Sequence, residues 1–490
     1  MKLQALLEAI RPVQIEGNVE CDLTGLAYDS RRVTPGMLFV ALPGLKQDGH
    51  EFVAAAVERG AVAVVCERDV PVPARLAKIS VTDARAAMAL MAARFYGQPS
   101  DHLRIVGVTG TNGKTTVSFL VKHLLGTRTG LLGTVRYEVG DRQIPAQRTT
   151  PEALELQQLL SQMIRAGCTG CALEVSSHAL EQHRVLGIAF DVGVFTNLTQ
   201  DHLDYHGTME EYFAAKQKLF GMLQSDRKSG RAVVNVDDPY GARLAKTFPG
   251  DRLLTYGLGA DAALRATDLK LAHGETQLTV EHEGLRLPCR LPFIGRHNVY
   301  NALAALGAGL SLQMNIKQLV ATLETAPPVP GRLEPLRLGQ PFEVFVDYAH
   351  TDDALGQVLT TLREITAGRL LLTFGCGGSR DAGKRSKMGA VAAQLADLTI
   401  ITTDNPRSES PASIAAQVEQ GYLGQRPDGC IIELDRTRAI DELIRAARPG
   451  DTVLIAGKGH ETYQEFQNTV VPFDDRLYAR DTLEALGHGR

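Results

Sequence analysis

The sequence predicts an α/β fold in three domains, with a central doubly wound sheet that carries a phosphate loop and a C-terminal Rossmann-like sheet. Three observations lead to this prediction. The 490 residues are too many for one ordinary core. Short apolar runs alternate with helical patterns along most of the chain. Turn-rich breaks at 97–103 and 326–336 separate three segments, so we place the domains at 1–97, 98–332 and 333–490.

The N-terminal segment predicts a small α/β unit. Apolar runs at 61–66 and 78–83 have the composition of strands, and the alanine-rich stretch 84–97 has that of a helix. The first residues have the pattern of a short amphipathic helix that carries Glu8 and lacks a cleavage pattern, so we expect no signal peptide.

The central segment predicts a mostly parallel sheet covered by helices on both faces. The run 104–110 is typical of a buried strand, ends in glycine and is followed by a helical pattern at 115–125. Residues 260–292 alternate like antiparallel strands, and 292–310 returns to a helix. Further buried strands are expected at 171–177, 191–197 and 231–237.

The C-terminal segment repeats one pattern, a buried strand that ends in a polar or glycine-rich loop. Ligands of open α/β sheets bind at the carboxyl ends of the strands, so we expect these loops to contain binding residues. The pattern occurs at 342–350, 369–378, 398–406, 429–435 and 451–461.

Composition excludes several classes of protein. Lys+Arg 52 against Asp+Glu 56 gives a net charge of −4, which argues against a basic nucleic-acid binder. Seven cysteines, an odd number, predict reduced thiols, and the single CxxC at 168–171 has no second pair with which to bind zinc. Apolar runs are too short to cross a bilayer. We therefore expect a cytoplasmic protein without membrane insertion or nucleic-acid partner, and a monomer.

The stretch GVTGTNGKTT at 107–116 is the sharpest local signal. Gly110 and Gly113 allow backbone N–H groups to face phosphate oxygens, Lys114 adds charge, and Thr115 offers a hydroxyl to Mg²⁺. Val108 stands where the strict phosphate-loop pattern has its first glycine. The loop predicts nucleotide binding but does not distinguish a kinase, a GTPase and a ligase.

Acidic and histidine side chains follow the next two predicted strands. Glu174 ends the first of them, where a carboxylate can hold Mg²⁺. The stretch 195–207 contains Asp201, His202, Asp204 and His206, a density that also fits a metallohydrolase. We favour a single metal contact from His202. By residue type alone, Lys216 is an exposed helix lysine.

Several motifs occur together in one order, and with them the sequence resembles the Mur ligase family from about residue 28 to 465. Asp352 is a departure, because the family commonly has proline there. The motifs are GTNGKTT (110–116), EVSSHALEQHRV (174–185), FTNLTQDHLDYHG (195–207), GRHNVYNALAA (295–305), PGRLE (330–334) and DYAHTDDAL (347–355).

The resemblance implies UDP-binding, ATP-binding and amino-acid-binding domains, with ATP as substrate and Mg²⁺ as cofactor. The implied ATP residues are Gly110, Thr111, Asn112, Gly113, Lys114, Thr115, Thr116, Asn298, Arg332, Asp347 and His350. The implied catalytic residues are Lys114, Glu174, His202 and Lys216. The implied metal ligands are Thr115, Glu174, His202 and a carbamylated Lys216, since a lysine with a depressed pKa can react with CO₂ to give an anionic carbamate.

A second set of residues is implied to contact a UDP-muramoyl dipeptide, and part of the loop 44–50 would form the uridine site. These residues are Tyr28, Ser30, Leu45, Lys46, Gln47, Thr149, Thr150, Ser176, Gln182 and Arg184.

The stretch DNPRSE at 404–409 resembles the motif of the diaminopimelate-adding branch of the family, although such residues also form turns without function. meso-Diaminopimelate differs from lysine by a remote carboxylate, which Arg407 can bind with a bidentate fork, whereas lysine would leave the guanidinium unpaired. The implied diaminopimelate residues are Arg380, Asp404, Asn405, Pro406, Arg407, Gly457 and Glu461.

The resemblance therefore implies a ligase of peptidoglycan precursor synthesis that uses ATP. It would add meso-diaminopimelate to the D-glutamate γ-carboxylate of UDP-N-acetylmuramoyl-L-alanyl-D-glutamate through an acyl phosphate. The alternatives are the L-lysine-adding ligase of the same family, folylpolyglutamate synthase, and a non-catalytic NTP-binding regulator.

Overall fold

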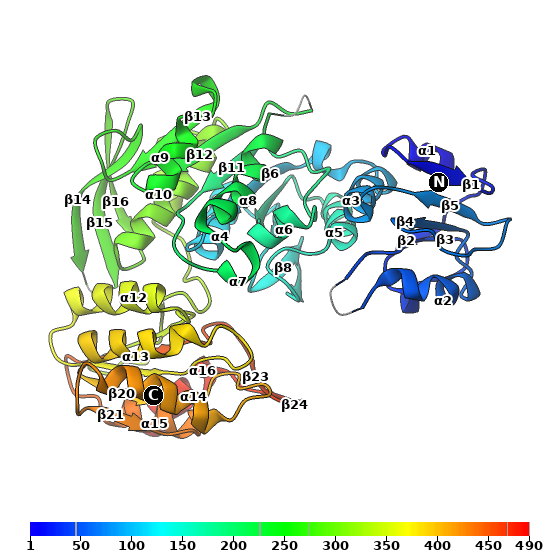
Figure 1. Ribbon diagram of the computed structural model, residues 1–490. Coiled ribbons are helices and arrows are strands. Elements are labelled where there is room, and N and C mark those ends of the chain that lie inside the picture. The colour runs from blue at the N-terminus through cyan, green and yellow to red at the C-terminus, as the bar shows by residue number, and fades with distance from the viewer. Residues whose placement is uncertain (45–46, 225–226, 273, 468, 490) are drawn as a thin grey trace.

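The structure is a computed structural model that describes residues 1–44, 47–224, 227–272, 274–467 and 469–489. Three large sheets follow one another along the chain, in the blue, green and orange parts of Figure 1, and a two-stranded sheet follows the third. The predicted α/β class with three domains is confirmed. Leu45 and Lys46, expected in the uridine site, lie outside the described residues.

The N-terminal domain is a five-stranded sheet with helices packed on it. Its strands are β1 (Gln14–Glu16), β2 (Gly25–Ala27), β3 (Met37–Val40), β4 (Ala63–Cys66) and β5 (Ala77–Ser80), in the order β1-β5-β4-β3-β2. Its α-helices are α1 (Leu3–Leu7), α2 (Val53–Glu58) and α3 (Ala84–Phe95). α3 begins where the Asp83 side chain accepts a hydrogen bond from the Ala86 N–H at 2.8 Å, a typical N-cap.

The central domain has an eleven-stranded sheet, ordered β16-β15-β14-β13-β12-β11-β6-β10-β7-β8-β9. Its middle, from β7 to β14, is parallel, and antiparallel strands extend both ends. The antiparallel strands between 260 and 292 were expected, whereas those between 136 and 145 were not. The strands are β6 (Arg104–Thr109), β7 (Thr129–Leu132), β8 (Arg136–Val139), β9 (Arg142–Pro145), β10 (Gly170–Glu174), β11 (Val192–Phe195), β12 (Arg231–Asn235), β13 (Leu253–Gly257), β14 (Leu264–Ala272), β15 (Glu275–His282) and β16 (Leu285–Leu291).

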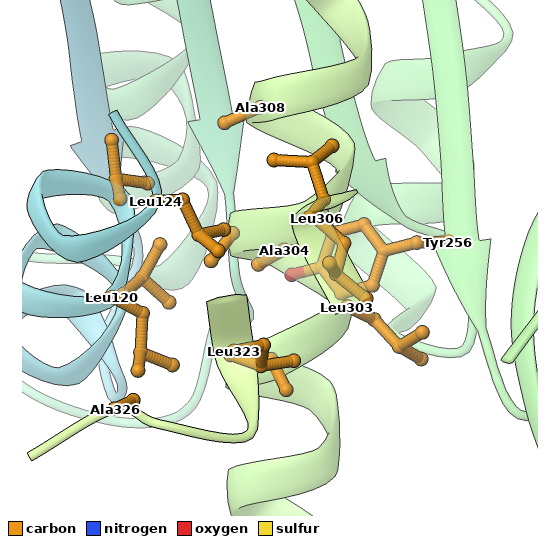
Figure 2. Close-up of a cluster of buried hydrophobic side chains, with 14 of the residues drawn as sticks. Leu120, Leu124, Tyr256, Leu303, Ala304, Leu306, Ala308, Leu323 and Ala326 are labelled. Carbon is orange, nitrogen blue, oxygen red and sulfur yellow. The ribbon is translucent and has the colours of Figure 1, made fainter. Parts of the chain in front are cut away.

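Helices cover both faces of the central sheet. They are α4 (Lys114–Leu125), α5 (Ala153–Arg165), α6 (Ser177–Glu181), α7 (Leu203–His206), α8 (Met209–Met222), α9 (Pro239–Ala245), α10 (Arg296–Ser311) and α11 (Ile316–Leu323). Leu120 and Leu124 of α4 belong to one apolar cluster with Leu303 and Leu306 of α10 (Figure 2). Because a buried leucine contributes roughly 2–5 kcal/mol relative to alanine, this cluster fixes the helix that follows the phosphate loop.

The C-terminal domain has a six-stranded sheet in the order β17-β18-β22-β19-β20-β21, parallel except for β17. The strands are β17 (Glu334–Pro335), β18 (Glu343–Asp347), β19 (Leu370–Phe374), β20 (Leu398–Ile401), β21 (Cys430–Ile432) and β22 (Thr452–Ala456), followed by the hairpin β23 (Tyr463–Phe466) and β24 (Thr469–Pro472). The helices are α12 (Asp352–Ile365), α13 (Gly383–Leu395), α14 (Pro411–Leu423), α15 (Arg436–Arg445) and α16 (Asp475–Ala485).

Strand order determines where the predicted site residues lie. In the central sheet, β6 lies between β10 and β11, so the phosphate loop is flanked by Glu174 and by the segment that starts at Thr196. In the C-terminal sheet, the loops after β18, β19, β20 and β22 emerge at one edge. None of the described helices is both long and apolar enough to cross a membrane.

Candidate active site

A cavity of about 940 Å³ lies between the central and C-terminal domains. The phosphate loop and Glu174 line it from the central domain, and Asp347 and His350 line it from the C-terminal domain. All the residues predicted to bind ATP line this cavity except Gly110. A cavity of this size can enclose a nucleotide.

The phosphate loop depends on two glycines. Gly110 has φ +147, and a Cβ there would lie 1.8 Å from the Thr196 Oγ1. Gly113 has φ +87, and a Cβ there would lie 2.3 Å from the Asn301 Oδ1. The Asn112 N–H donates to the Asn197 Oδ1 at 2.9 Å, so the loop is tied to the segment after β11. The loop therefore presents its backbone to the cavity in one fixed shape.

Lys216 is buried, not exposed as its residue type alone suggested. Its Nζ donates to the carbonyl oxygen of Gly110 at 2.9 Å and lies 4.4 Å from the centre of the Tyr212 ring. Lys114 donates to the same carbonyl at 3.0 Å. Burial, followed by repulsion from Lys114, holds the pKa of Lys216 well below its usual value. A lowered pKa favours the neutral, nucleophilic amine, which is the form that reacts with CO₂.

Glu174 ends β10 and is completely buried. Its carboxylate accepts hydrogen bonds from the Thr115 hydroxyl at 3.1 Å and from the Thr134 hydroxyl at 2.9 Å. The Thr134 N–H donates to the same carboxylate at 2.9 Å. The predicted metal ligands Thr115 and Glu174 are thus in direct contact at the wall of the cavity.

His202 lines the cavity at the start of α7, with a left-handed backbone at φ +54. Burial lowers its pKa, and the nearby Asp201 carboxylate opposes that effect. Neutral imidazole is the form that binds a metal. The other Asp and His side chains of the stretch 195–207 do not form a metal site, because no three His, Cys, Asp or Glu side chains of the described chain are placed to share a metal ion. The predicted Mg²⁺ site includes only two residues of these types, Glu174 and His202.

Arg332 joins the two domains across the cavity. Its Nη2 donates to the Thr115 hydroxyl at 3.1 Å, and its guanidinium lies 4.6 Å from the centre of the Tyr348 ring. Asp347 accepts from the Leu333 N–H at 2.6 Å and the Ala349 N–H at 2.7 Å. Burial raises the pKa of Asp347 above its usual value, although Arg332 and these two hydrogen bonds partly oppose that shift.

The turn that carries the unusual Asp352 is well capped. The Thr351 hydroxyl accepts from the Ala354 N–H at 3.2 Å, and α12 starts at Asp352. Two aspartates in the first turn of a helix are favoured by its dipole. Asp353 also accepts from the Asn112 amide at 3.2 Å, so this turn contacts the phosphate loop.

Most of the residues predicted to bind the muramoyl dipeptide form one hydrogen-bonded cluster next to Glu174. The Thr149 and Thr134 hydroxyl oxygens lie 3.0 Å apart, within hydrogen-bond distance, and Thr150 donates to the Glu174 carbonyl at 2.7 Å. The Ser176 N–H donates to the Thr150 hydroxyl at 3.1 Å. Arg184 donates to the Thr150 carbonyl at 3.0 Å and to the Gln182 side chain at 2.7 Å.

The N-terminal domain contributes the remaining described members of that set. Tyr28 donates to the Glu155 carboxylate of α5 at 2.8 Å, which ties the first two domains together. Ser30 begins the short 3₁₀ helix Ser30–Arg32, and Gln47 is exposed in the loop after β3. Neither side chain hydrogen-bonds to the cluster beside Glu174 within the described ranges.

Arg407 is paired within the protein itself, whereas the sequence led us to expect that only a remote carboxylate of the substrate would pair with it. Its Nε donates to the Glu465 carboxylate of β23 at 2.9 Å, and its Nη1 donates to the Gly378 carbonyl at 2.8 Å. The backbone is left-handed at φ +52, and the Arg407 N–H donates to the Glu465 carbonyl at 3.0 Å. An unpaired guanidinium therefore does not explain why lysine would be rejected.

The other predicted amino-acid residues lie mostly around Asn405. Its amide donates to the Glu461 carboxylate at 3.0 Å. The Gly457 N–H donates to the Asp347 carbonyl at 3.1 Å, which joins this site to the cavity. Asp404 accepts from the Asn405 N–H at 2.6 Å, and Pro406 accepts from the Glu409 N–H at 3.0 Å. Arg380 is exposed, and its side chain contacts none of these residues through a hydrogen bond in the described structure.

Three residues of the site were missed. Thr134 orients Glu174, Lys458 donates to Glu461 at 2.8 Å, and Glu465 pairs with Arg407. Lys458 follows β22 inside a glycine-rich loop that had been singled out, so its place in the sequence offered a signal. Thr134 and Glu465 follow no motif and are found only from their spatial neighbours.

Comparisons with known proteins agree with this arrangement. Three family models match in order, described as "Mur ligase family, catalytic domain" over 22–96, "Mur ligase middle domain" over 108–309 and "Mur ligase, glutamate ligase domain" over 331–459. The Geobacter metallireducens "UDP-N-acetylmuramoyl-L-alanyl-D-glutamate--2,6-diaminopimelate ligase" is 45% identical over 97% of both chains. The Geobacillus kaustophilus protein of that name is 44% identical over 99% of this chain and 100% of its own.

Solved structures give the same result. A structure titled as that same ligase has a TM-score of 0.71 and 34% identity, and covers 99% of both chains. A Mycobacterium tuberculosis folylpolyglutamate synthase has a TM-score of 0.61 at 19% identity and covers 76% of this chain and 93% of its own, a likeness of fold alone. From its matched family models and full-length relatives, the chain belongs to the Mur ligase family.

Proposed function

We propose that this chain joins meso-2,6-diaminopimelate to the γ-carboxylate of D-glutamate in UDP-N-acetylmuramoyl-L-alanyl-D-glutamate, using ATP. The observation that carries the proposal is the similarity, along almost the whole chain, to proteins named as ligases of these two substrates. The cavity between a phosphate loop and the C-terminal domain supports the use of ATP. We propose further that it acts as a monomer in the cytoplasm.

The first step activates the acid. An oxygen of the γ-carboxylate forms a bond to the terminal phosphorus of ATP, the bond from that phosphorus to the ADP oxygen breaks, and an acyl phosphate results. Lys114 at the phosphate loop and Arg332 across the cavity supply the positive charge that offsets the phosphate charge in this transfer. Arg184 and its neighbours Thr150 and Ser176 would hold the dipeptide beside Glu174.

The residues around Glu174 fit a magnesium ion. A buried carboxylate that meets a threonine hydroxyl from the phosphate loop provides the oxygen donors that Mg²⁺ prefers. Thr115, Glu174, His202 and a carbamylated Lys216 would hold the ion. When bound, Mg²⁺ neutralises charge on the phosphate oxygens.

The second step forms the amide. The neutral amine of diaminopimelate attacks the acyl carbon, a C–N bond forms, the C–O bond to phosphate breaks, and the proton lost by the amine leaves with the released phosphate. Arg407 would bind the remote carboxylate and Glu461 the remote ammonium. Arg407 follows β20 and Glu461 follows β22, at the same edge of the sheet as Asp347, which lines the cavity. Closure of the C-terminal domain would exclude water from the acyl phosphate.

Phosphate release tests the proposal. The full-length protein is incubated with ATP, Mg²⁺ and the UDP-linked dipeptide, with either meso-diaminopimelate or L-lysine, and products are identified by mass. We expect activity with meso-diaminopimelate, and a fall of at least about 100-fold in Arg407→Ala. Equal use of L-lysine would replace this proposal by the lysine-adding reaction, and ligation of glutamate to folate would replace it by folylpolyglutamate synthesis. Activity that persists in Arg407→Ala would show that Arg407 does not bind the amino acid.

A further inference from the structure

Four charged side chains gather at the amino-acid end of the site. Arg407 follows β20, Lys458 and Glu461 follow β22, and Glu465 lies on β23. They form two ion pairs, Arg407 Nε with Glu465 Oε2 at 2.9 Å and Lys458 Nζ with Glu461 Oε2 at 2.8 Å. The hairpin of β23 and β24 thus brings a carboxylate that sequence analysis did not assign into contact with the predicted substrate-binding arginine.

Asn405 connects the two pairs. Its Oδ1 accepts from the Lys458 Nζ at 3.1 Å and from the Glu465 backbone N–H at 3.0 Å, and its Nδ2 donates to Glu461 at 3.0 Å. Lys458 is completely buried, and its Nζ lies 5.4 Å from the centre of the Tyr463 ring. The four charges are therefore held in one hydrogen-bonded frame.

The frame still has capacity to bind a ligand. The Nη2 of Arg407 donates to no residue in the described part of the chain, and the Arg407 and Glu465 side chains are 24% and 34% exposed. A carboxylate can reach the free edge of the guanidinium without first breaking the pair with Glu465. Glu461, with 17% of its side chain exposed, can accept from an ammonium in the same way.

The charges of the frame sum to zero, with two cations and two carboxylates. The two other charged members of the predicted set, Asp404 and Arg380, are of opposite sign and leave that sum unchanged. The far end of meso-diaminopimelate carries one carboxylate and one ammonium and leaves that sum unchanged. The far end of L-lysine carries only an ammonium and adds one positive charge. A partly buried site penalises an unbalanced charge because water screens it poorly.

We propose that Glu465 is a specificity-determining residue. Its negative charge offsets the positive charge of Arg407, so the site selects an amino acid whose far end carries both a carboxylate and an ammonium. Lys458 offsets the charge of Glu461 and positions Glu461 and Asn405. This inference rests on the proposed function. It explains rejection of lysine by charge balance, in place of an unpaired guanidinium.

The competing interpretation is that Glu465 only fastens the hairpin. The backbone already does this in part, because the Gln467 N–H donates to the Arg407 carbonyl at 2.7 Å. A fastening role predicts that loss of Glu465 lowers kcat/KM for every amino acid by one factor. A role in charge balance predicts that the ratios between amino acids change.

The test compares three amino acids in full-length native protein, Glu465→Gln and Glu484→Gln. The amino acids are meso-diaminopimelate, L-lysine and L-2-aminopimelate, which keeps the remote carboxylate and lacks the remote amine. Glu484 is an exposed glutamate of α16 in the same domain, so its variant controls for loss of one negative charge. In Glu465→Gln the frame becomes positive. We therefore expect kcat/KM for L-2-aminopimelate to rise roughly three- to tenfold relative to meso-diaminopimelate, with no gain for L-lysine.

Lys458→Gln provides the reciprocal measurement. Its frame becomes negative, so kcat/KM for L-lysine is expected to rise relative to meso-diaminopimelate by a similar factor. Ratios that stay at their native values in Glu465→Gln, or that move equally in Glu484→Gln, would overturn the inference while the proposed function stands. Native protein inactive with meso-diaminopimelate would overturn the proposed function, and this inference with it.

Discussion

Lys114 and Lys216 donate to one acceptor, the carbonyl oxygen of Gly110, at 3.0 and 2.9 Å. Two ammonium groups at one buried oxygen would repel each other, and burial together with this repulsion disfavours the charged form of Lys216. Conversion of the Lys216 amine to a carbamate would replace that repulsion by attraction to Lys114. The geometry thus favours carbamylation of one lysine and retention of charge on the other.

Replacement of Lys216 by arginine should abolish this modification. We expect Lys216→Arg to lower phosphate release by at least about 100-fold. Carbon-13 NMR after incubation with labelled bicarbonate should show a carbamate signal in native protein and not in the variant. Lys218→Arg is the matched control, because Lys218 is on the same helix, is exposed and pairs with Glu181 at 2.8 Å. A native level of activity in Lys216→Arg would contradict the assignment.

The phosphate loop should require glycine at position 113 for two reasons, its left-handed backbone angle and the close approach of Asn301. Gly113→Ala places a Cβ 2.3 Å from the Asn301 Oδ1 at φ +87, so we expect ATP affinity to fall at least about tenfold in calorimetry. Gly126 ends the same helix at φ +89, with no described heavy atom within 4 Å of its Cβ position. Gly126→Ala should lower Tm slightly and leave ATP affinity unchanged. Equal losses of affinity in both variants would mean that the contact with Asn301 is unimportant.

A buried ion pair beneath the amino-acid site should be critical for stability. Arg436 of α15 and Asp475 of α16 are completely buried and pair at 2.7 Å. Arg436 also donates to the Ala456 carbonyl at 2.9 Å, directly before Gly457. Asp475→Asn leaves a buried cation without its partner, so we expect a cost of about 3–5 kcal/mol, seen as a lower Tm, and a higher KM for the amino acid.

The double variant Arg436→Met, Asp475→Leu checks that prediction. It removes both charges, and apolar side chains in place of a buried pair cost less than one orphaned charge. Its Tm should therefore lie above that of Asp475→Asn. A double variant less stable than the single one would show that the hydrogen bonds of Arg436 to backbone matter more than its charge.

Glu409 should give the C-terminal domain an acid-sensitive contribution to stability. Hydrogen bonds from Arg385, at 2.8 and 2.9 Å, and then from the Ser379 N–H lower the pKa of Glu409 to about 2. Because the folded pKa lies below the ordinary value of 4.5, the stabilisation is complete above pH 4.5 and is lost as pH falls toward 2.

Thermal unfolding of Glu409→Gln measures this effect. The variant should have a lower Tm than native protein at pH 7, and the difference should shrink at pH 3. Glu419→Gln, on the neighbouring helix α14, should show little difference at either pH. A gap in Tm that stays constant from pH 7 to pH 3 would exclude Glu409 as its source.

The sequence predicted the parts of the fold that are specified by local patterns. The strand, glycine loop and helix around Gly110, and the antiparallel strands after residue 260, were found because their signals occupy neighbouring residues. The antiparallel strands β8 and β9 were missed, as was the hairpin of β23 and β24. Its turn has no glycine, and Gln467 adopts a left-handed backbone at φ +48 instead.

The site residues likewise fall into those that a local motif predicted and those that only the fold reveals. Residues within a motif, such as Lys114 and Asn405, were predicted by resemblance, and the structure places Lys114 at the cavity. The partners that orient them come from elsewhere in the chain. Thr134 contacts Glu174 across 40 positions, and Glu465 contacts Arg407 across 58. The burial of Lys216 was likewise not evident, because it depends on how α8 packs beside the phosphate loop.

Adjacent strands of one sheet carry residues predicted to contact the nucleotide and the incoming amino acid. Asp347 ends β18, Gly457 follows β22, and the two are hydrogen-bonded at 3.1 Å. A rigid rotation of the C-terminal domain must therefore carry both together. Docking of this domain onto bound nucleotide and delivery of the nucleophile to the acyl carbon would be a single mechanical event, so an enzyme held open would lose amide formation even with every side chain intact.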